Sequence, residues 1–327
     1  MRKQFLGLTL SSILFALCAS AQAEQPKKIP RVGFVATTGP DAPNIEPFRR
    51  GLRDLGYIDG KNILVEYRYA EGKQERFPSL VAELVQLKVD VVVTGLLPAI
   101  LAAKQATKAI PIVIVTAQDP VATGLIDSLA RPGGNITGLA GLTRELSGKR
   151  LELLQEVVPG ISRVAVLWDT NAPGAAIGLK EYEAAARALK IPLQSLEVQG
   201  PNPDSEGAFQ AAAKGRANAL ITIRSSLLTT SYRKQITDLA MKNRLPSMYE
   251  GSNWVEAGGL MSYTSNEADM YRRAATYVDK ILKGAKPGDL PVEQARKFEL
   301  IVNLKAAKQI GLTIPQTVLY RADKVIK

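Results

Sequence analysis

The sequence predicts an α/β protein made of two similar units in tandem, each with a parallel sheet. Two observations support this: strand and helix patterns alternate after a short polar leader, and the series then runs a second time. The expected strands of the first unit are apolar on both faces, as a sheet covered by helices requires. We expect strands at Val32–Ala36, Ile63–Tyr67, Val89–Thr94 and Ile112–Thr116, and helices at Glu46–Leu55, Arg76–Leu87 and Pro98–Thr107.

The second unit is recognised by three matches at nearly one period. The stretch RVGFVATTGP from Arg31 is echoed by RVAVLWDTNAP from Arg163, at an offset of 132 residues. VDVVVTG from Val89 is echoed by ANALITI from Ala217, at an offset of 128, and AIPIVIV by RLPSMYE, at an offset of 135. This spacing predicts a two-copy duplication rather than a solenoid, which needs several shorter repeats.

The first 23 residues have the layout of a secretory signal peptide. Arg2 and Lys3 form a basic start, Phe5–Leu17 is an apolar run, and the small residues before Glu24 suit a cleavage site. The apolar run is shorter than the roughly 20 residues that span a bilayer. We therefore expect cleavage near Ala23 and a mature protein in the periplasm.

The residue types that are missing exclude several kinds of chemistry. The 327 residues include no histidine, and the single cysteine, Cys18, lies in the predicted signal peptide. Zinc sites built from Cys and His, Ser-His-Asp triads and Cys-His dyads are thereby excluded from the mature chain. We expect no cofactor and no metal ion.

The net charge of +11 does not indicate nucleic-acid binding. The densest basic pairs, Arg49-Arg50 and Arg272-Arg273, sit in helical patterns among acidic or apolar residues. Such pairs are typical of a solvated helix face and do not form a stripe that follows phosphates.

The glycine pair in LARPGGNITGL, Gly133-Gly134, could terminate a helix or cradle a phosphate. A dinucleotide loop follows the first strand as Gly-x-Gly-x-x-Gly, and neither unit has that spacing. The pair is better interpreted as the stop of a helix at Ile126–Ala130. A connection to the second unit would follow, whose first helix is expected at Arg144–Val158.

Long stretches of the chain resemble one family of bacterial ABC-transporter substrate-binding proteins, the family with tryptophan- and tyrosine-type binding components. The stretches cover most of the mature chain: DPVATGLIDSLARPGGNITGLAGLT, FRRGLRDLGYIDGKNILVEYRYAEG, EAGGLMSY and LPVEQARKFELIVNLKAAKQIGLTIPQTVL. The resemblance implies a type I periplasmic-binding fold, in which two Rossmann-like lobes close over a ligand. The three crossings between the lobes would fall near Ile136–Thr143, Ser262–Asn266 and Leu290–Lys297.

On this basis we expect lobe 1 to comprise residues 30–140 plus 266–291, and lobe 2 residues 141–265 plus 292–327. The implied function is the extracytoplasmic solute-binding component of an ABC importer. Its partners would be a small-molecule ligand and an ABC permease in the inner membrane, with no nucleic acid. A monomer is expected, because such a receptor must present both lobes to its transporter.

In open α/β sheets, ligands bind outside the carboxyl ends of the strands, so the candidate site consists of strand-end residues. The candidates in the first lobe are Thr37, Thr38, Thr94, Gly95, Gln118 and Asp119, and those in the second are Trp168, Asn171, Arg224, Ser225, Tyr249 and Glu250.

Each candidate also has a structural interpretation. Thr37 and Thr38 have hydroxyls that suit a ligand carboxylate, or a turn before the next helix. Gly95 would let a ligand approach backbone amides, or satisfy a loop that needs a positive φ. Asp119, followed by Pro120, is typical of a helix N-cap, and its carboxylate also suits a ligand ammonium.

The second lobe offers similar alternatives. Trp168 either packs in the core or stacks on an aromatic ligand. Asn171 is a cap or a contact, and Arg224, after the strand at Leu220–Ile223, either holds a ligand carboxylate or forms a surface ion pair. An acid, an arginine, hydroxyls and aromatic rings together favour an amino acid or an aromatic carboxylate as the ligand.

Two other functions compete with transport. A ligand sensor of the same fold would dock on a membrane receptor kinase, and the sequence does not separate it from a transport protein. A hydrolase or lyase could use Asp119 with Glu250 for acid–base work, although no motif places the two acids together. A repressor is excluded, because an export signal and no helix-turn-helix precedes the first strand.

Overall fold

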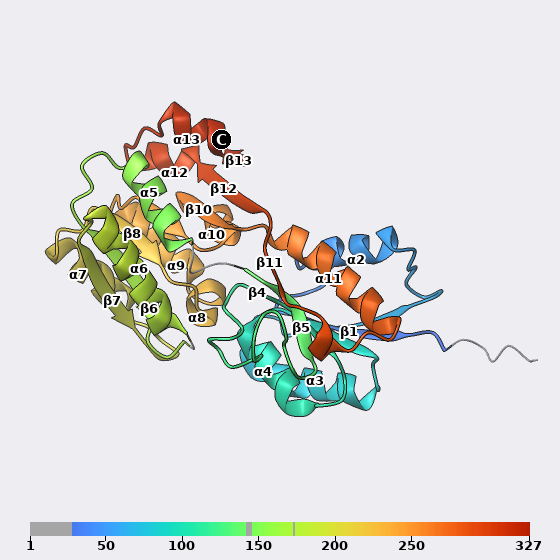
Figure 1. The fold of residues 1–327 in the computed structure, drawn as a ribbon. Helices are drawn as coiled ribbons and strands as arrows, with labels where there is room; N and C mark the ends of the chain where they lie inside the picture. The colour runs from blue at the N-terminus through green and yellow to red at the C-terminus, as the bar shows by residue number, and fades with distance from the viewer. Residues whose placement is uncertain (1–27, 142–145, 173) are drawn as a thin grey trace, which may run out of the picture.

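The computed structural model describes residues 28–141, 146–172 and 174–327, so the predicted signal peptide lies outside the described residues. The described residues form two α/β lobes (Figure 1). We call the six-stranded sheet with its helices lobe 1. The seven-stranded sheet with its helices is lobe 2. Within the described ranges, no helix is long and apolar enough to cross a membrane.

Lobe 1 contains a fully parallel sheet in the order β11-β5-β4-β3-β1-β2. Helices α2 and α11 cover one face of this sheet, and α3 and α4 cover the other. The bounds are β1 (Arg31–Ala36), α2 (Ile45–Asp54), β2 (Leu64–Tyr69), the 3-10 turn η1 (Gln74–Arg76), α3 (Phe77–Gln86), β3 (Val91–Thr94), α4 (Leu97–Ala106), β4 (Ile112–Thr116), β5 (Ile136–Ala140), α11 (Glu267–Leu282), the 3-10 turn η2 (Pro287–Asp289) and β11 (Glu293–Gln294).

The amphipathic pattern of α2 explains how this helix docks. Ile45, Phe48 and Leu52 are buried on one face, at the spacing of successive helical turns. Gly51 lets α11 approach closely, because a Cβ there would overlap the carbonyl oxygen of Arg272. The predicted strands and helices of this unit are confirmed to within two residues at each end. The edge strand β2 differs in that it is only half-buried, so it is not apolar on both faces.

Lobe 2 repeats the strand order of lobe 1 and extends it. Its order is β13-β12-β10-β9-β8-β6-β7, parallel except for the antiparallel pair β10–β12. Helices α5, α6, α12 and α13 cover one face, and α7, α9 and α10 the other. The bounds are α5 (Ser147–Val157), β6 (Val164–Asp169), α6 (Ala175–Leu189), β7 (Leu193–Val198), α7 (Ser205–Lys214), β8 (Ala219–Thr222), α8 (Ser226–Thr230), α9 (Arg233–Lys242), β9 (Ser247–Tyr249), α10 (Ser252–Glu256), β10 (Met261–Ser265), β12 (Phe298–Asn303), α12 (Leu304–Gln309), α13 (Gln316–Arg321) and β13 (Lys324–Ile326).

The predicted duplication is confirmed by the topology. Strands β2-β1-β3-β4-β5 of lobe 1 correspond in order to β7-β6-β8-β9-β10 of lobe 2. The chain passes between the lobes after β5, between β10 and α11, and between β11 and β12 (Figure 1).

The interpretation of the glycine pair was wrong in two respects. Residues 126–130 form no helix; Asp119 instead caps a turn over residues 120–124. The pair then leads into β5, the strand that the sequence analysis missed, and not into the second lobe. Gly133 does have a positive φ of 84°, and its N–H donates to Gly288 of lobe 1.

One expected crossing and one expected lobe boundary differ from the structure, whereas the third crossing, between β11 and β12, falls within the expected range Leu290–Lys297. Residues 136–140 are β5, so the first crossing comes later, between β5 and α5, and residues 142–145 lie outside the described residues. The short strand β11 pairs with β5 in lobe 1, although it was expected in lobe 2. Backbone pairing decides this position, and the polar sequence of Glu293–Gln294 carries no strand signal.

Candidate functional site

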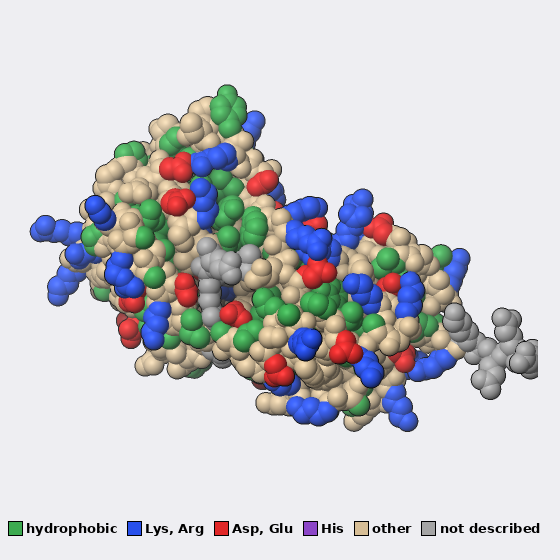
Figure 2. All heavy atoms as spheres, in the orientation of Figure 1, with side chains coloured by type: hydrophobic (Ala, Val, Ile, Leu, Met, Phe, Trp, Pro, Cys, Tyr) green, Lys and Arg blue, Asp and Glu red, His purple; other side chains and the backbone are tan. Residues whose placement is uncertain are grey.

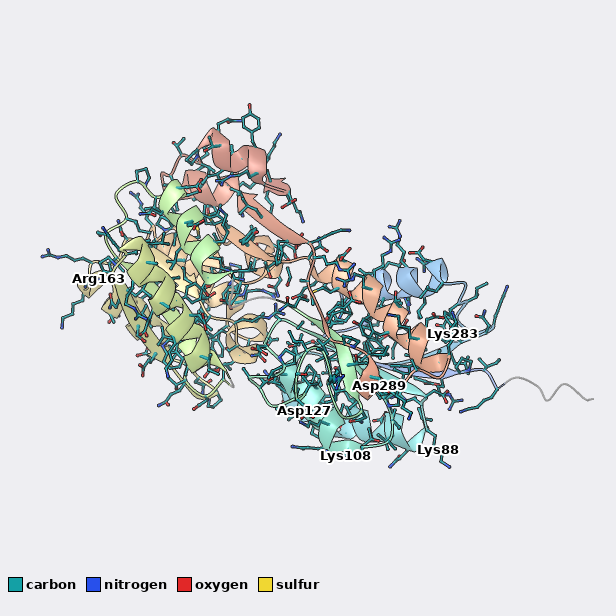
Figure 3. The ribbon with its side chains drawn as sticks, viewed as in Figure 1. Lys88, Lys108, Asp127, Arg163, Lys283 and Asp289 are labelled. Carbon is teal, nitrogen blue, oxygen red and sulfur yellow. The ribbon has the colours of Figure 1, made fainter. Side chains whose placement is uncertain are left out.

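The carboxyl ends of the parallel strands in both sheets face the space between the lobes. Lys88, Lys108 and Arg163 precede β3, β4 and β6, and Figure 3 shows them at the outer ends of the lobes, away from this space. Basic and acidic side chains are interspersed over both lobes on the face in Figure 2, which therefore shows no basic stripe.

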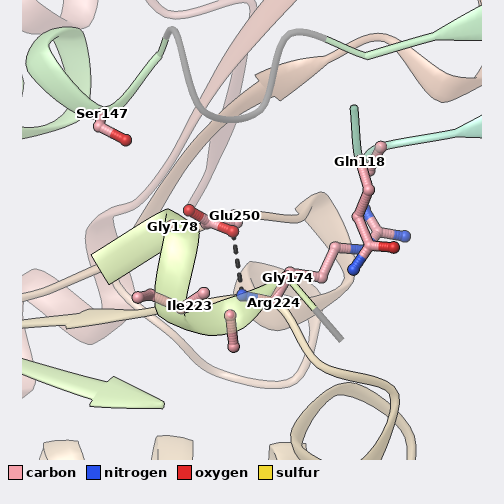
Figure 4. Close-up of a pocket in the computed structure, with 9 residues that line it drawn as sticks. Gln118, Ser147, Gly174, Gly178, Ile223, Arg224 and Glu250 are labelled. Carbon is pink, nitrogen blue, oxygen red and sulfur yellow. Dashed lines mark hydrogen bonds between the residues drawn. The ribbon is translucent and has the colours of Figure 1, made fainter. Parts of the chain in front are cut away.

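Two neighbouring cavities lie between the lobes, and Gln118 of lobe 1 lines both. The first has about 400 Å³ of empty space and the second about 720 Å³, each including space open to solvent. The first is lined by Ala117, Gln118, Ser147, Gly174, Ala175, Gly178, Ile223, Arg224 and Glu250 (Figure 4). The second is lined by Gln74, Leu97, Pro98, Gln118, Asp169, Asn171, Ala172, Gly200, Pro201, Ser225 and Leu227.

Glu250, which lines the first cavity, belongs to a buried hydrogen-bonded cluster. Glu250, directly after β9, accepts bonds from the Arg150 guanidinium (3.1 Å) and the Tyr182 hydroxyl (2.7 Å) at Oε1. Its Oε2 accepts from the backbone N–H of Arg224 (2.9 Å). Arg150 is fully buried and also donates through Nε to the carbonyl of Tyr263 in β10. Both oxygens of Glu250 are thus bound within lobe 2.

The protonation of Tyr182 follows from its burial. Desolvation raises the pKa of the Tyr182 hydroxyl well above its ordinary value; Arg150 opposes the rise and Glu250 adds to it. Tyr182 is therefore a neutral donor over the physiological range. A paired and hydrogen-bonded set of this kind is rigid, because breaking either partner leaves a buried charge uncompensated.

Arg224 links the two lobes beside the first cavity. Its backbone follows β8 in lobe 2, while its guanidinium donates to Glu267 at 2.7 Å. Glu267 is the first residue of α11, which packs against α2 in lobe 1. Arg224 forms an ion pair, with 19% of its side chain exposed, and it also lines the cavity.

Five of the predicted site residues line at least one of the two cavities: Gln118, Asn171, Arg224, Ser225 and Glu250. Ser225 also caps α8, since its Oγ accepts from the N–H of Leu228. Thr37, Thr38, Thr94, Gly95, Asp119, Trp168 and Tyr249 do not line these two cavities.

The two aromatic candidates are part of the core of lobe 2. The Trp168 indole N–H donates to Ser195 Oγ at 2.7 Å, and the ring lies in the apolar cluster beneath α5 and α6. Tyr249 is fully buried and stacks on Trp254, with ring centroids 4.8 Å apart. Both rings therefore pack in the core of lobe 2, and neither lines the two cavities.

Gly95 does not have the positive φ that one of its two predicted roles requires, and its predicted contact with a ligand stays a prediction. The Tyr271 hydroxyl occupies the space where a Cβ would lie. The residue instead lets α11 pack against the end of β3.

Several cavity residues were missed by sequence reasoning. Ser147, Gly174, Ala175 and Gly178 belong to the starts of two helices, and small residues give no chemical signal. Arg150 was missed although a signal existed. It shares the buried face of α5 with Leu154 and Val157, at helical spacing, and an arginine at such a position needs a partner.

Two α/β lobes with this strand order, joined by three crossings around cavities lined by both lobes, define a type I periplasmic-binding fold. Residues 40–326 match the family of ABC transporter substrate-binding proteins, and the chain belongs to this family. Proteins of this family are the solute-binding components of ABC transporters. The partners of this chain are therefore a small molecule and an ABC transporter.

Similar proteins include a tyrosine-binding protein of Clostridioides difficile (strain R20291). It is 27% identical over 267 residues, which cover 81% of this chain and 75% of that protein. A conserved domain protein from Vibrio cholerae is 28% identical with a TM-score of 0.81, covering 91% of this chain and 100% of that one. A Streptococcus pneumonia structure in complex with L-Trp is 23% identical with a TM-score of 0.80, covering 91% and 99%.

Proposed function

We propose that this chain is the periplasmic receptor of an ABC importer for an aromatic amino acid, which it captures by closure of its two lobes. The observation that carries the proposal is a cavity lined by both lobes, with Gln118 on one side and Arg224 and Glu250 on the other. The 27% identical tyrosine-binding relative supports an aromatic amino acid as the ligand.

The Arg224–Glu267 ion pair supports closure as the mechanism of capture. It joins the lobes next to the cavity and would be separated if the lobes moved apart. A ligand that contacts both walls would favour the closed arrangement, as in other hinge-closing receptors. We further propose that the receptor is a monomer, released by cleavage near Ala23, with lobe boundaries near residues 140, 265 and 295.

The proposal is tested by a thermal-shift screen of the purified protein after unfolding and refolding, which removes ligand carried through purification. The panel contains the amino acids, substituted benzoates, sugars and nucleosides. Tyrosine or tryptophan at 100 times its Kd should stabilise the fold by about 2.7 kcal/mol. A shift confined to sugars or nucleosides would contradict the proposed ligand class.

A further inference from the structure

We propose that Asp169, in the second cavity, binds the ammonium group of the ligand and makes the receptor selective for solutes that carry one. The inference rests on the proposed function, because it assigns one end of the captured amino acid to one side chain. The second cavity is the larger of the two and neighbours the first at Gln118, which lines both.

Asp169 supplies the charge of the second cavity. Leu97 and Pro98, at the start of α4, line it from lobe 1, and Asp169, the last residue of β6, lines it from lobe 2. Every other described residue that lines this cavity is neutral. The described lining therefore carries a net negative charge at a point between the lobes, which favours a cationic group of the solute.

The Asp169 carboxylate is buried without a cationic partner. The residue is 5% exposed, and it forms no ion pair with any described residue. Acidic side chains are almost never buried to this extent unless they are paired. Oδ1 accepts a bond from the N–H of Asn171 at 3.0 Å. Oδ2 accepts none from a described residue and retains accessible surface, so a solute in the cavity can reach it.

The turn that follows β6 explains Oδ1 but not the charge. Besides the bond from the Asn171 N–H, the carbonyl oxygen of Asp169 accepts from the N–H of Ala172 at 3.1 Å. An asparagine would supply the same side-chain acceptor for this turn without burying a charge. What aspartate adds is a second carboxylate oxygen and a negative charge at the cavity.

The other acids near the cavities are already engaged or lie elsewhere. Glu250 pairs with Arg150, and Glu267 pairs with Arg224. Asp119, whose carboxylate suits an ammonium on sequence grounds, does not line either cavity, and its Oδ1 accepts two backbone N–H bonds. Asp169 is thus the acid that the structure leaves for a ligand ammonium.

Closure of the lobes makes this carboxylate a selectivity device. As the solute displaces water from the cavity, the carboxylate loses solvent and is strongly disfavoured unless the solute brings a positive charge. An ammonium donates a charge-assisted bond to Oδ2 and compensates this loss. A solute of the same shape without the ammonium leaves a buried charge unpaired and is rejected. Leu97 and Leu227 supply apolar surface for the body of the solute.

The test compares three ligands by isothermal titration calorimetry: L-tyrosine, tyramine, which lacks the carboxylate, and 3-(4-hydroxyphenyl)propionate, which lacks the ammonium. The wild-type protein should bind tyrosine at least about tenfold more tightly than the propionate. Asp169→Asn keeps the acceptor for the Asn171 N–H and removes the charge. It should weaken tyrosine and tyramine at least about tenfold and leave the propionate within about twofold of wild type.

Asp59→Asn is the matched control. The Asp59 Oδ1 likewise accepts a backbone N–H, from Val65 at 3.0 Å, so this variant also keeps a turn and removes one negative charge. Asp59 precedes β2 and therefore lies at the edge of the lobe 1 sheet that points away from the cavities. The variant should bind all three ligands as the wild type does.

The outcomes separate the two proposals. A wild-type protein that binds no aromatic amino acid overturns the proposed function and this inference with it. A wild-type protein that binds tyrosine, with unchanged affinity in Asp169→Asn, overturns the inference alone. Equal losses for tyrosine and the propionate in Asp169→Asn would also overturn it, because the effect would then come from the turn. An equal loss in Asp59→Asn would do the same, since it would reflect net charge.

Discussion

The two lobes share one strand order, but the carboxyl ends of their sheets differ in what they present. At the end of β3 in lobe 1, Thr94 is followed by Gly95, which packs against Tyr271 of α11. At the corresponding end of β8 in lobe 2, Thr222 is followed by Ile223 and then Arg224, which line the first cavity. The residues directly after the two strands thus differ: Gly95 is packed against α11, and the chain after β3 reaches a cavity only at Leu97 and Pro98.

The ion pairs of the two lobes also differ, in how deeply they are buried. Lobe 2 contains the fully buried Arg150 with Glu250, whereas an ion pair of lobe 1 such as Arg272–Asp54 leaves 50% and 44% of its side chains exposed. Buried charges with fixed partners hold a wall in one geometry, while exposed pairs contribute little to stability. We infer that lobe 2 is the preorganised half of the site and lobe 1 its cover.

The largest expected effect is in the buried cluster. Glu250→Ala leaves the Arg150 guanidinium buried without a carboxylate and should lower the free energy of unfolding by about 3–5 kcal/mol. The exposed counterpart in lobe 1, Asp54→Ala, should cost less than about 1 kcal/mol. Urea unfolding of both variants measures the difference. Similar losses in the two variants would contradict the contrast between the lobes.

The packing of Gly95 against α11 in lobe 1 gives the next largest effect. Gly95→Ala places a Cβ against the Tyr271 hydroxyl and 3.1 Å from the Val115 carbonyl oxygen. The overlap should cost about 1–3 kcal/mol in the same unfolding assay. Gly39→Ala is the control, since no atom lies within 4 Å of its Cβ position, and it should stay within about 0.5 kcal/mol. An unchanged Gly95→Ala variant would show that α11 is not tightly packed there.

The strands and helices were predictable because periodicity and burial determine them locally. β5 was missed, since Ile136–Ala140 contains a glycine at its centre and follows a loop with its own strong turn signal. Gly138 is needed there because a Cβ would overlap the Ile114 backbone of β4. That requirement arises from a neighbouring strand, and no local pattern reveals it.

The sequence predicted cavity residues that follow strands, but not those that lie on helices. Residues after β4, β6, β8 and β9 do face the cavities, because parallel strands end at one edge of the sheet. Residues on helix starts and on the buried face of α5 were not found. Their role depends on how two distant elements meet, as when Arg150 on α5 reaches Glu250 after β9, 100 residues later.

Substituting Trp168 tests whether its ring packs in the core of lobe 2 or stacks on the ligand. Trp168→Phe removes the indole bond to Ser195 Oγ and should cost about 1–2 kcal/mol of stability. The Kd for ligand should stay within about twofold of wild type, because the ring lies in the apolar core. Ser195→Ala isolates the hydrogen bond. Loss of ligand binding in Trp168→Phe would restore the stacking interpretation.

The smallest expected effect lies at the third crossing between the lobes, on β12. Burial raises the pKa of Glu299 above its ordinary value of 4.5, and the charges of Asp323 and Glu267 add to the rise. The folded state therefore binds this proton more tightly than the unfolded state. Ionisation of Glu299 lowers stability as the pH rises through the folded-state pKa.

Glu299→Gln removes this penalty and should raise the free energy of unfolding at pH 7 by less than about 1 kcal/mol, since the side chain is only partly buried. The glutamine can still accept the bond from Asn266. The gain should shrink as the pH falls below 4.5, where wild-type Glu299 is protonated in both states. Urea unfolding at pH 7 and at pH 4 measures this. An equal gain at both pH values would assign the effect to packing at the crossing, and a loss at pH 7 would show that the carboxylate stabilises it.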